Sequence, residues 1–247
     1  MANIIHSGRR AFLGSLGAGA AAFFSTRGLY AEALALTAPS SEGPFYPDKM
    51  PLDTDNDLII INDSITPAAG EITWLSGRLL TETGQPIRNA VIEIWQCDSK
   101  ESYIHTKGRA AQNDSNFQGY GRYLTDSTGH YFFRTIKPIS YTLLGMFRSP
   151  HIHYAISRNG KRVFTTMIGV RGHKDNARDP VFNRINAAEL STLLVDFKPL
   201  PGSKIGELTA TVDMVVNKTA FEGDDGVLRG TIGKSTWEGF GNFGKKK

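Results

Sequence analysis

The sequence predicts an all-β protein: an antiparallel β-sandwich with long loops, an extended N-terminal arm and at most short helices. Three observations favour this class. From about residue 70, short runs rich in β-branched and aromatic residues alternate with turn residues. Asn159-Gly160 separates two of these runs and is a strong hairpin signal. No long helical pattern alternates with the runs, which disfavours a parallel βαβ sheet.

The expected strands follow one another within residues 71–220, the predicted sandwich domain. They are the runs EITWLSGRLL, AVIEIWQC, YFFRTI, HIHYAIS, KRVFTTMIG and ELTATVDMVVN. Turn residues such as TETGQP and DSTG separate neighbouring runs. The only credible helical turn is NAAELSTLLV, residues 186–195. With 247 residues and 40% hydrophobic content, the chain can bury a substantial core.

The first 35 residues are typical of an export signal. Arg9-Arg10 precedes Phe12-Leu13 and the small, uncharged run LGSLGAGAAAFFS, as in twin-arginine signals. This run is shorter than the roughly 20 apolar residues that a membrane span needs. We therefore expect an exported protein, periplasmic or secreted, with no membrane span after processing.

Two further segments flank the predicted sandwich. Residues 36–70 are rich in proline and aspartate and predict an extended arm that lies over the sandwich. Residues 221–247 form a glycine-rich tail with Trp237, Phe240 and Phe243. The tail is either a flexible terminus or a strap onto a neighbouring subunit of a homo-oligomer.

Charge and cysteine content exclude two kinds of protein. The formal charge of +4 falls to +2 without residues 1–33, which hold three basic residues and one acidic residue. A net charge this small does not indicate the basic surface that binds nucleic acid. Cys97 is the single cysteine, so the chain has no intramolecular disulfide. An exported protein of this kind depends on its core, a metal or subunit contacts for stability.

Two histidines in one expected strand indicate a metal site. His151 and His153 are two residues apart, so their side chains project from the same face of the strand. Two ligands are too few for a catalytic metal, and the rest of the chain has to supply the others. Candidates that could converge on the pair include the acidic residues and the following side chains: Tyr103, His105, His130, Tyr141 and His173.

Three longer runs carry a resemblance to a known family. They are LSGRLLTETGQPIRNAVIEIWQCDSKESYIH, NFQGYGRYLTDSTGHYFFRTIKPISY and RSPHIHYAI. In this order and spacing they resemble the intradiol ring-cleavage dioxygenases, especially the iron-bearing chain of protocatechuate 3,4-dioxygenase. The resemblance runs from about residue 43 to residue 217, and its motifs are highly specific. It implies an enzyme that incorporates both atoms of O2 into an aromatic diol.

The resemblance also implies a metal and its ligands. The ferric ligands of the family fall on Tyr103, Tyr141, His151 and His153, and all four residue types match. One non-haem Fe(III) per chain is therefore expected, with a hydroxide as fifth ligand. Two tyrosinates and a hydroxide would balance the three charges of the ion. The resemblance further implies that a binding catechol would displace the hydroxide as water and Tyr141 as neutral tyrosine. The ring would then open between its two hydroxyl-bearing carbons, giving a muconate-type diacid.

Three further residues are assigned to the site. Arg148 matches the arginine of the Arg-x-Pro-His-Ile-His pattern and is expected to stabilise carbanion-like charge on the substrate. Thr166 stands where the protocatechuate enzymes have glutamine, and Tyr46 is a candidate for the pocket mouth. The segment YTLLGMFR from Tyr141 is also shorter than in those enzymes. These departures favour catechol or hydroxyquinol over protocatechuate.

Two other interpretations remain open on the sequence. The pattern TDSTGHYFFRTIKPISY also occurs in prealbumin-like binding modules, where the tyrosine only packs. Such a non-catalytic module would keep a prealbumin- or immunoglobulin-like sandwich. In the other interpretation, copper or zinc binds to His105, His151 and His153.

Overall fold

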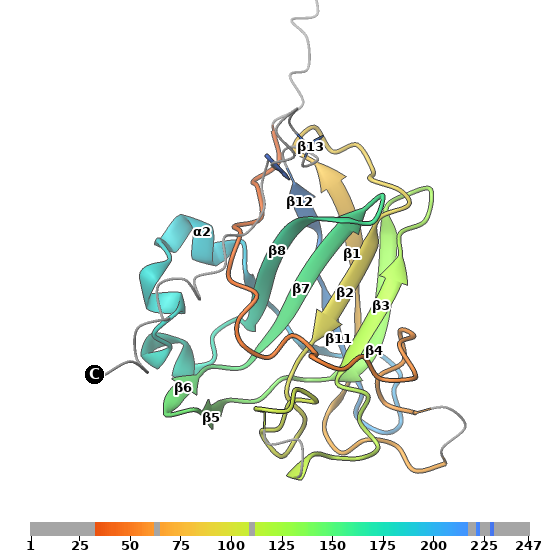
Figure 1. Ribbon diagram of the computed structural model, residues 1–247, viewed down its shortest axis with the longest axis vertical. Helices are drawn as coiled ribbons and strands as arrows, with labels where there is room; N and C mark the ends of the chain where they lie inside the picture. The colour runs from red at the N-terminus through yellow and green to blue at the C-terminus, as the bar shows by residue number, and fades with distance from the viewer. Residues whose placement is uncertain (1–32, 62–64, 109–111, 217–220, 223–227, 230–247) are drawn as a thin grey trace, which may run out of the picture. The chain divides into compact units, whose positions relative to one another are not determined.

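The computed structural model describes residues 33–61, 65–108 and 112–216, together with the backbone of two short strands, β13 (Phe221–Glu222) and β14 (Leu228–Arg229). This part of the chain is mostly strand and loop with little helix, which confirms the all-β class (Figure 1). The predicted export signal lies outside the described residues, apart from its last three positions. Trp237, Phe240 and Phe243 of the tail also lie outside them.

The first sheet is mixed, so the expectation of a purely antiparallel arrangement is wrong. Its strand order is β10–β11–β1–β12, and β4 also pairs with β1. The strands are β1 (Ile72–Thr81), β4 (His130–Ile136), β10 (Lys198–Pro199), β11 (Leu208–Thr211) and β12 (Met214–Val216). β1 is antiparallel to β4 but parallel to β11 and β12, which pair with successive parts of it. Alternating hydrophobicity gives a strand its faces but not its direction, so the sequence did not reveal these parallel pairs.

The second sheet carries the histidine pair in its central strand. Its order is β3–β2–β7–β8–β9. The strands are β2 (Val91–Trp95), β3 (Tyr120–Leu124), β7 (His151–Arg158), β8 (Lys161–Val170) and β9 (Leu194–Val195). The predicted hairpin is confirmed: Asn159 and Gly160 alone join β7 to β8, with φ of 50° and 74°. Two positive φ angles are what a tight hairpin of this kind requires.

A β-bulge shifts the register of this hairpin. Ser157 pairs with Arg162, but Ile156 pairs with Phe164, so Val163 is the extra residue. Beyond the bulge, His153 lies opposite Met167. Because side chains alternate along a strand, one inserted residue exchanges the two faces of the rest of β8.

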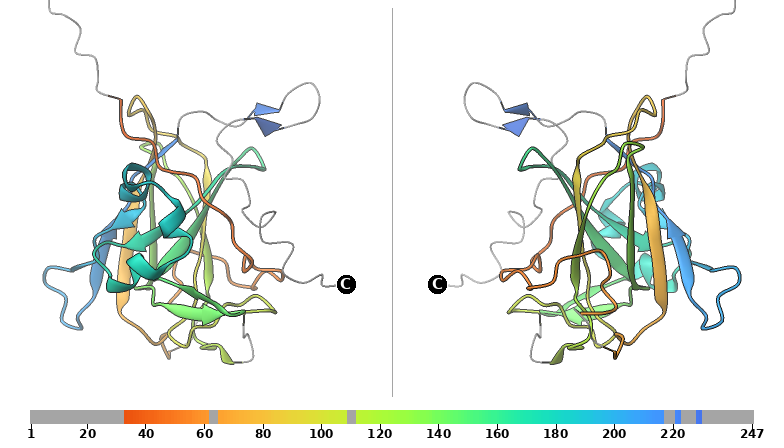
Figure 2. Two further views of the ribbon diagram at one scale, coloured as in Figure 1. Left: turned by 90° about the vertical axis from the view of Figure 1, so that its left-hand side faces the viewer. Right: turned by 90° about the vertical axis from the view of Figure 1, so that its right-hand side faces the viewer.

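One hydrophobic core lies between the two sheets, which form two layers in the side views of Figure 2. Leu75 and Phe133 contribute from the first sheet, and Ile94 and Ile152 from the second. Leu58, in the N-terminal arm, is fully buried in the same core. His151 and His153 alternate with Ile152 along β7, so they project from the other face of the second sheet.

Short elements flank this outer face. They are β5 (Tyr141–Leu143), β6 (Met146–Arg148), η2 (Lys174–Arg178), η3 (Phe182–Arg184) and α2 (Ala187–Ser191). The predicted helical turn is present as α2, which Asn186 caps by accepting a hydrogen bond from the Glu189 amide at 2.9 Å. Within the described ranges, no helix has the length and apolar character needed to cross a membrane.

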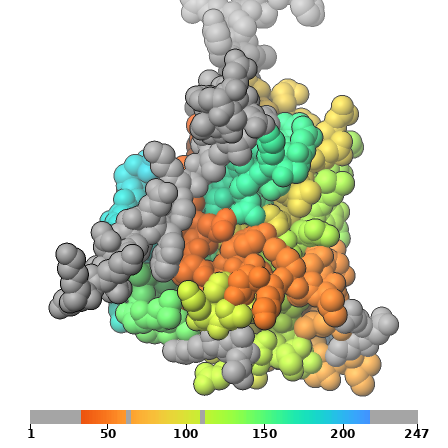
Figure 3. All heavy atoms as spheres, viewed as in Figure 1, coloured from red at the N-terminus to blue at the C-terminus, as the bar shows by residue number. Residues whose placement is uncertain are grey.

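The described part of the N-terminal arm connects β12 of the first sheet to β8 of the second without forming a strand of its own. The Thr37 amide donates to the Val215 carbonyl of β12, and the Ser40 amide donates to the Thr165 carbonyl of β8. In Figure 3 the orange arm covers the front of the molecule, between β7–β8 and the loop that carries Tyr103. The arm therefore covers the face from which the two histidines project.

Candidate metal centre

Four predicted ligand side chains meet on the outer face of the second sheet. We call Tyr103, Tyr141, His151 and His153 the Tyr–His cluster. The Tyr103 hydroxyl lies 3.4 Å from the Tyr141 hydroxyl, which lies 3.4 Å from His151 Nε2. His151 Nε2 lies 3.2 Å from His153 Nε2. All four residues are buried. Adjacent ligand atoms bound at roughly 2.0–2.2 Å to one ion lie about 3 Å apart, so these spacings suit a common metal.

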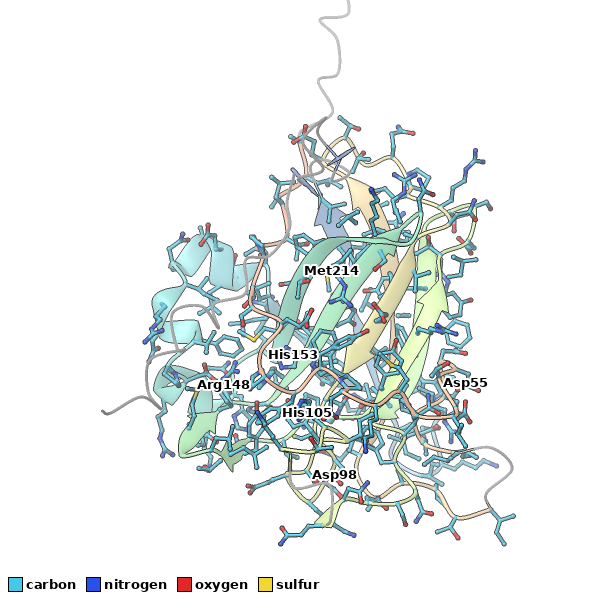
Figure 4. All side chains as sticks on the ribbon, viewed as in Figure 1. Asp55, Asp98, His105, Arg148, His153 and Met214 are labelled. Atoms are coloured by element: carbon cyan, nitrogen blue, oxygen red, sulfur yellow. The ribbon has the colours of Figure 1, made fainter. Side chains whose placement is uncertain are left out.

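The two histidines are held by the centre of the second sheet. β7 pairs with β2 on one side and β8 on the other, so the backbone at His153 is fixed by Trp95 and Met167. Figure 4 labels His153 and Arg148, which lie toward the lower end of the β7–β8 pair. Rigid strands hold ligands more accurately than loops do.

A short hairpin sets Tyr141 beside Arg148. β5 and β6 are joined by Leu144 and Gly145, both with positive φ, so Tyr141 and Arg148 lie directly opposite each other. Leu144 adopts φ of 51°, a strained conformation for a residue with a side chain. The tight turn thus places a predicted ligand and the predicted catalytic cation on one rigid unit.

Tyr103 comes from a loop that a buried carboxylate organises. Asp98 Oδ1 accepts hydrogen bonds from the Lys100 and Ser102 amides at 2.8 and 2.9 Å, and Oδ2 accepts from the Asp114 amide. Such side-chain turns are the usual role of aspartate in loops. The Tyr103 amide in turn donates to the Gly108 carbonyl at 2.8 Å, which closes the loop.

Burial keeps every member of the cluster neutral in the absence of a cation. It raises the pKa of Tyr103 well above its usual value, and the neighbouring Tyr141 adds to this shift. Burial also raises the pKa of Tyr141 to about 12, although the Arg148 charge opposes the rise. The pKa values of His151 and His153 are lowered, first by burial and then by adjacent groups that include Arg148. The cluster therefore offers two neutral phenols and two neutral imidazoles, whose oxygen and nitrogen atoms can bind a positive ion.

The backbone fixes which nitrogen of His151 faces the cluster. His151 Nδ1 lies 2.6 Å from the Ser149 carbonyl oxygen, which can only accept a hydrogen bond. Nδ1 therefore carries the proton, and the lone pair of Nε2 points toward Tyr141 and His153. His153 Nδ1 has no hydrogen-bond partner among the described residues.

Arg148 is buried beside the cluster in an ion pair. Its Nε donates to Asp179 Oδ2 at 3.0 Å, and its Nη2 lies 3.2 Å from Met167 Sδ. The side chain of Asp179 is fully buried. Arg148 was predicted in the site, whereas contacts from Asp179 and Met167 were not, because both residues approach Arg148 only through tertiary structure.

Aromatic residues and a glycine form the walls around the ligands. Trp95 stacks on His153, with 4.9 Å between ring centroids and 6° between planes. Phe45 of the arm stacks on Tyr103 at 4.9 Å. A Cβ on Gly43 would lie 3.1 Å from His153 Cε1, so the arm approaches this ring as closely as a glycine allows. Trp95 was expected to pack in the core or near the site without a catalytic role, whereas no contact with the ligands was predicted for Gly43 or Phe45.

The two predicted pocket residues do not join the cluster. Thr166 pairs with Tyr154, on the face of β8 opposite to that of Met167, and its hydroxyl donates to the Ala38 carbonyl at 2.6 Å. The bulge at Val163 is the physical reason for this change of face. Tyr46 is half-buried; its ring contacts Trp95, and its hydroxyl donates to Glu93 at 2.8 Å.

Glu93 joins the arm to the second sheet. Tyr46 and Tyr120 both donate hydrogen bonds to Glu93 Oε1, and Arg162 Nη2 lies 3.1 Å from Oε2. Arg162 also pairs with Glu42 of the arm. This network fixes the arm on either side of Gly43 and Phe45, which themselves contact the ligand rings.

The three-histidine set for copper or zinc is not assembled. His105 Nδ1 accepts a hydrogen bond from the Lys107 amide, and His105 Nε2 lies 3.9 Å from Asp48. In the part of the chain that the structure describes, no three His, Cys, Asp or Glu side chains are grouped to hold a metal. The donor set that does converge includes two tyrosines.

The fold and the cluster together define an all-β protein with a buried donor set of two phenols and two imidazoles. A family profile described as "Dioxygenase" matches residues 41–197. The chain therefore belongs to the intradiol ring-cleaving dioxygenase family.

Individual relatives agree with this assignment. The chain is 36% identical over 134 residues to the protocatechuate 3,4-dioxygenase beta chain of Burkholderia cepacia, covering 52% of this chain and 57% of the relative. It is 31% identical over 150 residues to catechol 1,2-dioxygenase of Acinetobacter baylyi, covering 55% and 47%. The chain thus matches about half the length of these relatives.

A solved structure supports the fold. The catechol 1,2-dioxygenase of Acinetobacter sp. ADP1 superposes with a TM-score of 0.60 at 22% identity, covering 90% of this chain and 74% of that chain. At this level of identity the likeness concerns the fold alone.

Proposed function

We propose that this chain is a non-haem Fe(III) intradiol dioxygenase on a prealbumin-type β-sandwich. It would cleave a catechol-type ring between the two hydroxyl-bearing carbons with O2, giving a muconate-type diacid. The observation that carries this proposal is the convergence of two buried phenols and two buried imidazoles, with neighbouring donor atoms 3.2–3.4 Å apart.

The chemistry of the donor set favours a ferric ion. A phenol with a pKa near 10 costs roughly 4 kcal/mol to ionise at pH 7, and burial increases this cost for Tyr103 and Tyr141. A trivalent cation offsets it, because two phenolates cancel most of its charge. When bound, Fe(III) supplies the Lewis acidity that makes the chelated diol reactive toward O2.

The side chains of the cluster would then have distinct tasks. His151 offers the lone pair of Nε2 because Ser149 holds its proton at Nδ1. Tyr141, as a phenolate, can accept a proton at its Oη from a substrate hydroxyl and leave as neutral tyrosine. Tyr103 has Phe45 stacked on its ring and would remain as a ligand throughout.

Arg148 would stabilise the charge that develops on the substrate ring. It lies opposite Tyr141 in the β5–β6 hairpin and is almost fully buried, so solvent screens it little. A fixed positive charge near the reacting carbons lowers the barrier because it acts where negative charge appears in the transition state.

We further propose a substrate without a carboxylate, namely a catechol or hydroxyquinol. Thr166 does not support this choice, because it lies on the other face of β8. The support comes from the walls of the cluster, where apolar groups such as Trp95 and Leu143 offer no charge to pair with a substrate carboxylate.

Export by a twin-arginine route is also a proposal, supported by Arg9-Arg10 and the apolar run that follows. Replacing both arginines with lysine should keep the protein in the cytoplasm. Unchanged export of this variant would contradict the proposal.

The decisive experiment is a visible spectrum of the iron-loaded protein with and without catechol, combined with oxygen uptake and product analysis. We expect a coloured protein, a new absorption band on anaerobic addition of catechol, and one O2 consumed per muconate-type product. Catechol and hydroxyquinol should have a higher kcat/KM than protocatechuate. Ligand binding without oxygen uptake would favour the non-catalytic binding module.

A further inference from the structure

We propose that Asp179 is a positioning residue for ring cleavage. Its carboxylate would hold the Arg148 guanidinium and, through the Ser149 backbone, the His151 imidazole in their working orientations. This inference rests on the proposed function, because it assigns Asp179 a role in that same site.

Asp179 is held by four hydrogen bonds. Oδ2 accepts from Arg148 Nε at 3.0 Å and from the Ser149 amide at 2.7 Å. Oδ1 accepts from the Val181 and Phe182 amides at 2.8 and 2.9 Å. The side chain is fully buried. Two bonds to each oxygen leave the carboxylate no freedom to rotate, so it provides a fixed reference point.

The contact at Nε orients the guanidinium of Arg148. An arginine side chain has many rotamers, and without a partner it would not keep one orientation. Asp179 holds Nε and Met167 Sδ lies at Nη2, so the plane of the guanidinium is determined at two of its three nitrogens. Neither contact uses Nη1.

The same carboxylate oxygen acts on a metal ligand by a second route. Asp179 Oδ2 accepts from the Ser149 amide, and the Ser149 carbonyl accepts the proton of His151 Nδ1 at 2.6 Å. Ser149 is thus held at both its backbone amide and its backbone carbonyl. Groups that orient a ligand in this way commonly affect metal affinity or activity by 10- to 100-fold.

Asp179 comes from a segment far from these residues in sequence. It directly follows η2, and its Oδ1 contacts lie at the start of η3. Asn176 of η2 accepts a hydrogen bond from the Ser149 hydroxyl at 2.6 Å, so η2 also contacts the 148–151 segment independently of Asp179. Removing this second contact at Asn176 therefore tests the effect of simply loosening η2 from Ser149, with Asp179 unchanged.

The first variant is Asp179→Asn, studied as the full iron-loaded chain. Asparagine keeps the size of the side chain but removes the charge that pairs with Arg148, and its NH2 group repels the donors at one oxygen position, either those of Arg148 and Ser149 or those of Val181 and Phe182. We expect kcat per bound iron to fall by about 10- to 100-fold with little change in KM. The anaerobic catechol complex should still form, with its visible absorption band.

A double-mutant cycle distinguishes positioning from general damage. If Asp179 acts mainly through Arg148, Asp179→Asn should lower kcat by no more than about threefold when Arg148→Ala is already present. An equal loss in both backgrounds would overturn the proposal for Arg148. Wild-type kcat in a folded Asp179→Asn variant would overturn it entirely.

The control variant is Asn176→Ala. It removes the other contact between η2 and Ser149 and leaves the Asp179 carboxylate in place. We expect a lower Tm with kcat per bound iron unchanged. A loss of kcat equal to that of Asp179→Asn would show that loop stability alone matters, and would refute a specific role for the carboxylate. Absence of ring cleavage in the wild-type protein would instead refute the proposed function, before any variant is compared.

Discussion

The indole of Trp95 lies parallel to the imidazole of His153, with 4.9 Å between the ring centroids and 6° between the planes. The arm approaches the same imidazole at Gly43, close to its Cε1 atom. His153 therefore has little room to move, and its Nε2 keeps its direction toward the cluster. Small changes at these contacts should be measurable at the metal.

Gly43→Ala should weaken iron binding. Gly43 adopts φ of 71°, where a side chain costs about 1–2 kcal/mol, and the new methyl group would press on His153. Gly160→Ala is the matched control, because Gly160 has φ of 74° and nothing within 4 Å of the added Cβ. Urea unfolding should show a loss of stability in both variants, larger for Gly43→Ala because of the contact with His153. Only Gly43→Ala should lose iron faster to a chelator, and equal iron loss in the two would contradict the contact.

Single replacements of the two tyrosines should change the colour of the iron-loaded protein in different ways. Tyr141→Phe should retain some iron and colour but lose the group that accepts the substrate proton. Tyr103→Phe should most change the spectrum of the catechol complex, since Tyr103 is the ligand expected to stay. Tyr154→Phe is the control, because Tyr154 is buried in the main core between the sheets and is not one of the predicted ligands. Colour that is unchanged in both ligand variants would exclude tyrosinate ligation.

Arg162→Ala should loosen the arm. The change removes the pairs with Glu42 and Glu93, and it leaves Glu93 with two tyrosines but no cation. We expect a loss of about 1–3 kcal/mol in the free energy of unfolding, together with faster proteolysis of the arm. Arg78→Ala, which breaks an exposed pair with Asp213, should cost less than about 1 kcal/mol. Similar losses in the two variants would refute the anchoring role.

Stability of the metal-free protein should fall as the pH drops below about 6.5. Burial lowers the pKa of His151 and His153 in the folded state, whereas in the unfolded chain both titrate near 6.5. The unfolded chain thus binds protons that the folded chain does not. Each histidine should remove about 1.4 kcal/mol per pH unit. Urea titrations between pH 6.5 and 5 should show a shallower slope for His153→Gln, and an identical slope would contradict this account.

Much of the fold could be predicted from the sequence because local patterns encode it, whereas the four predicted ligand residues followed from the resemblance to a known family. Asn159-Gly160 predicted the β7–β8 hairpin, and the spacing of His151 and His153 predicted a shared face. The parallel pairing of β1 with β11 was not predictable, because it joins segments more than 130 residues apart without a local signal.

The position of Thr166 shows why a pocket is harder to predict than a strand. Counted outward from the Asn159-Gly160 turn without interruption, Thr166 would lie opposite His153. The bulge at Val163 moves Met167 into that place and sends Thr166 to the other face. One inserted residue has little signature in a sequence, yet it decides which side chains reach the site. Asp179 was not predicted either, because only tertiary contacts bring it to Arg148 and no local pattern marks them.

The hydrogen bond from Thr37 to Val215 has a consequence for the order of events during synthesis. The chain emerges from the ribosome from its N-terminus, so Thr37 has no partner until 178 further residues have been added. The segment with Gly43 and Phe45 has partners nearer in sequence, Glu93 for Tyr46 and Thr165 for Ser40, so it can dock over the ligand rings before the start of the arm is anchored.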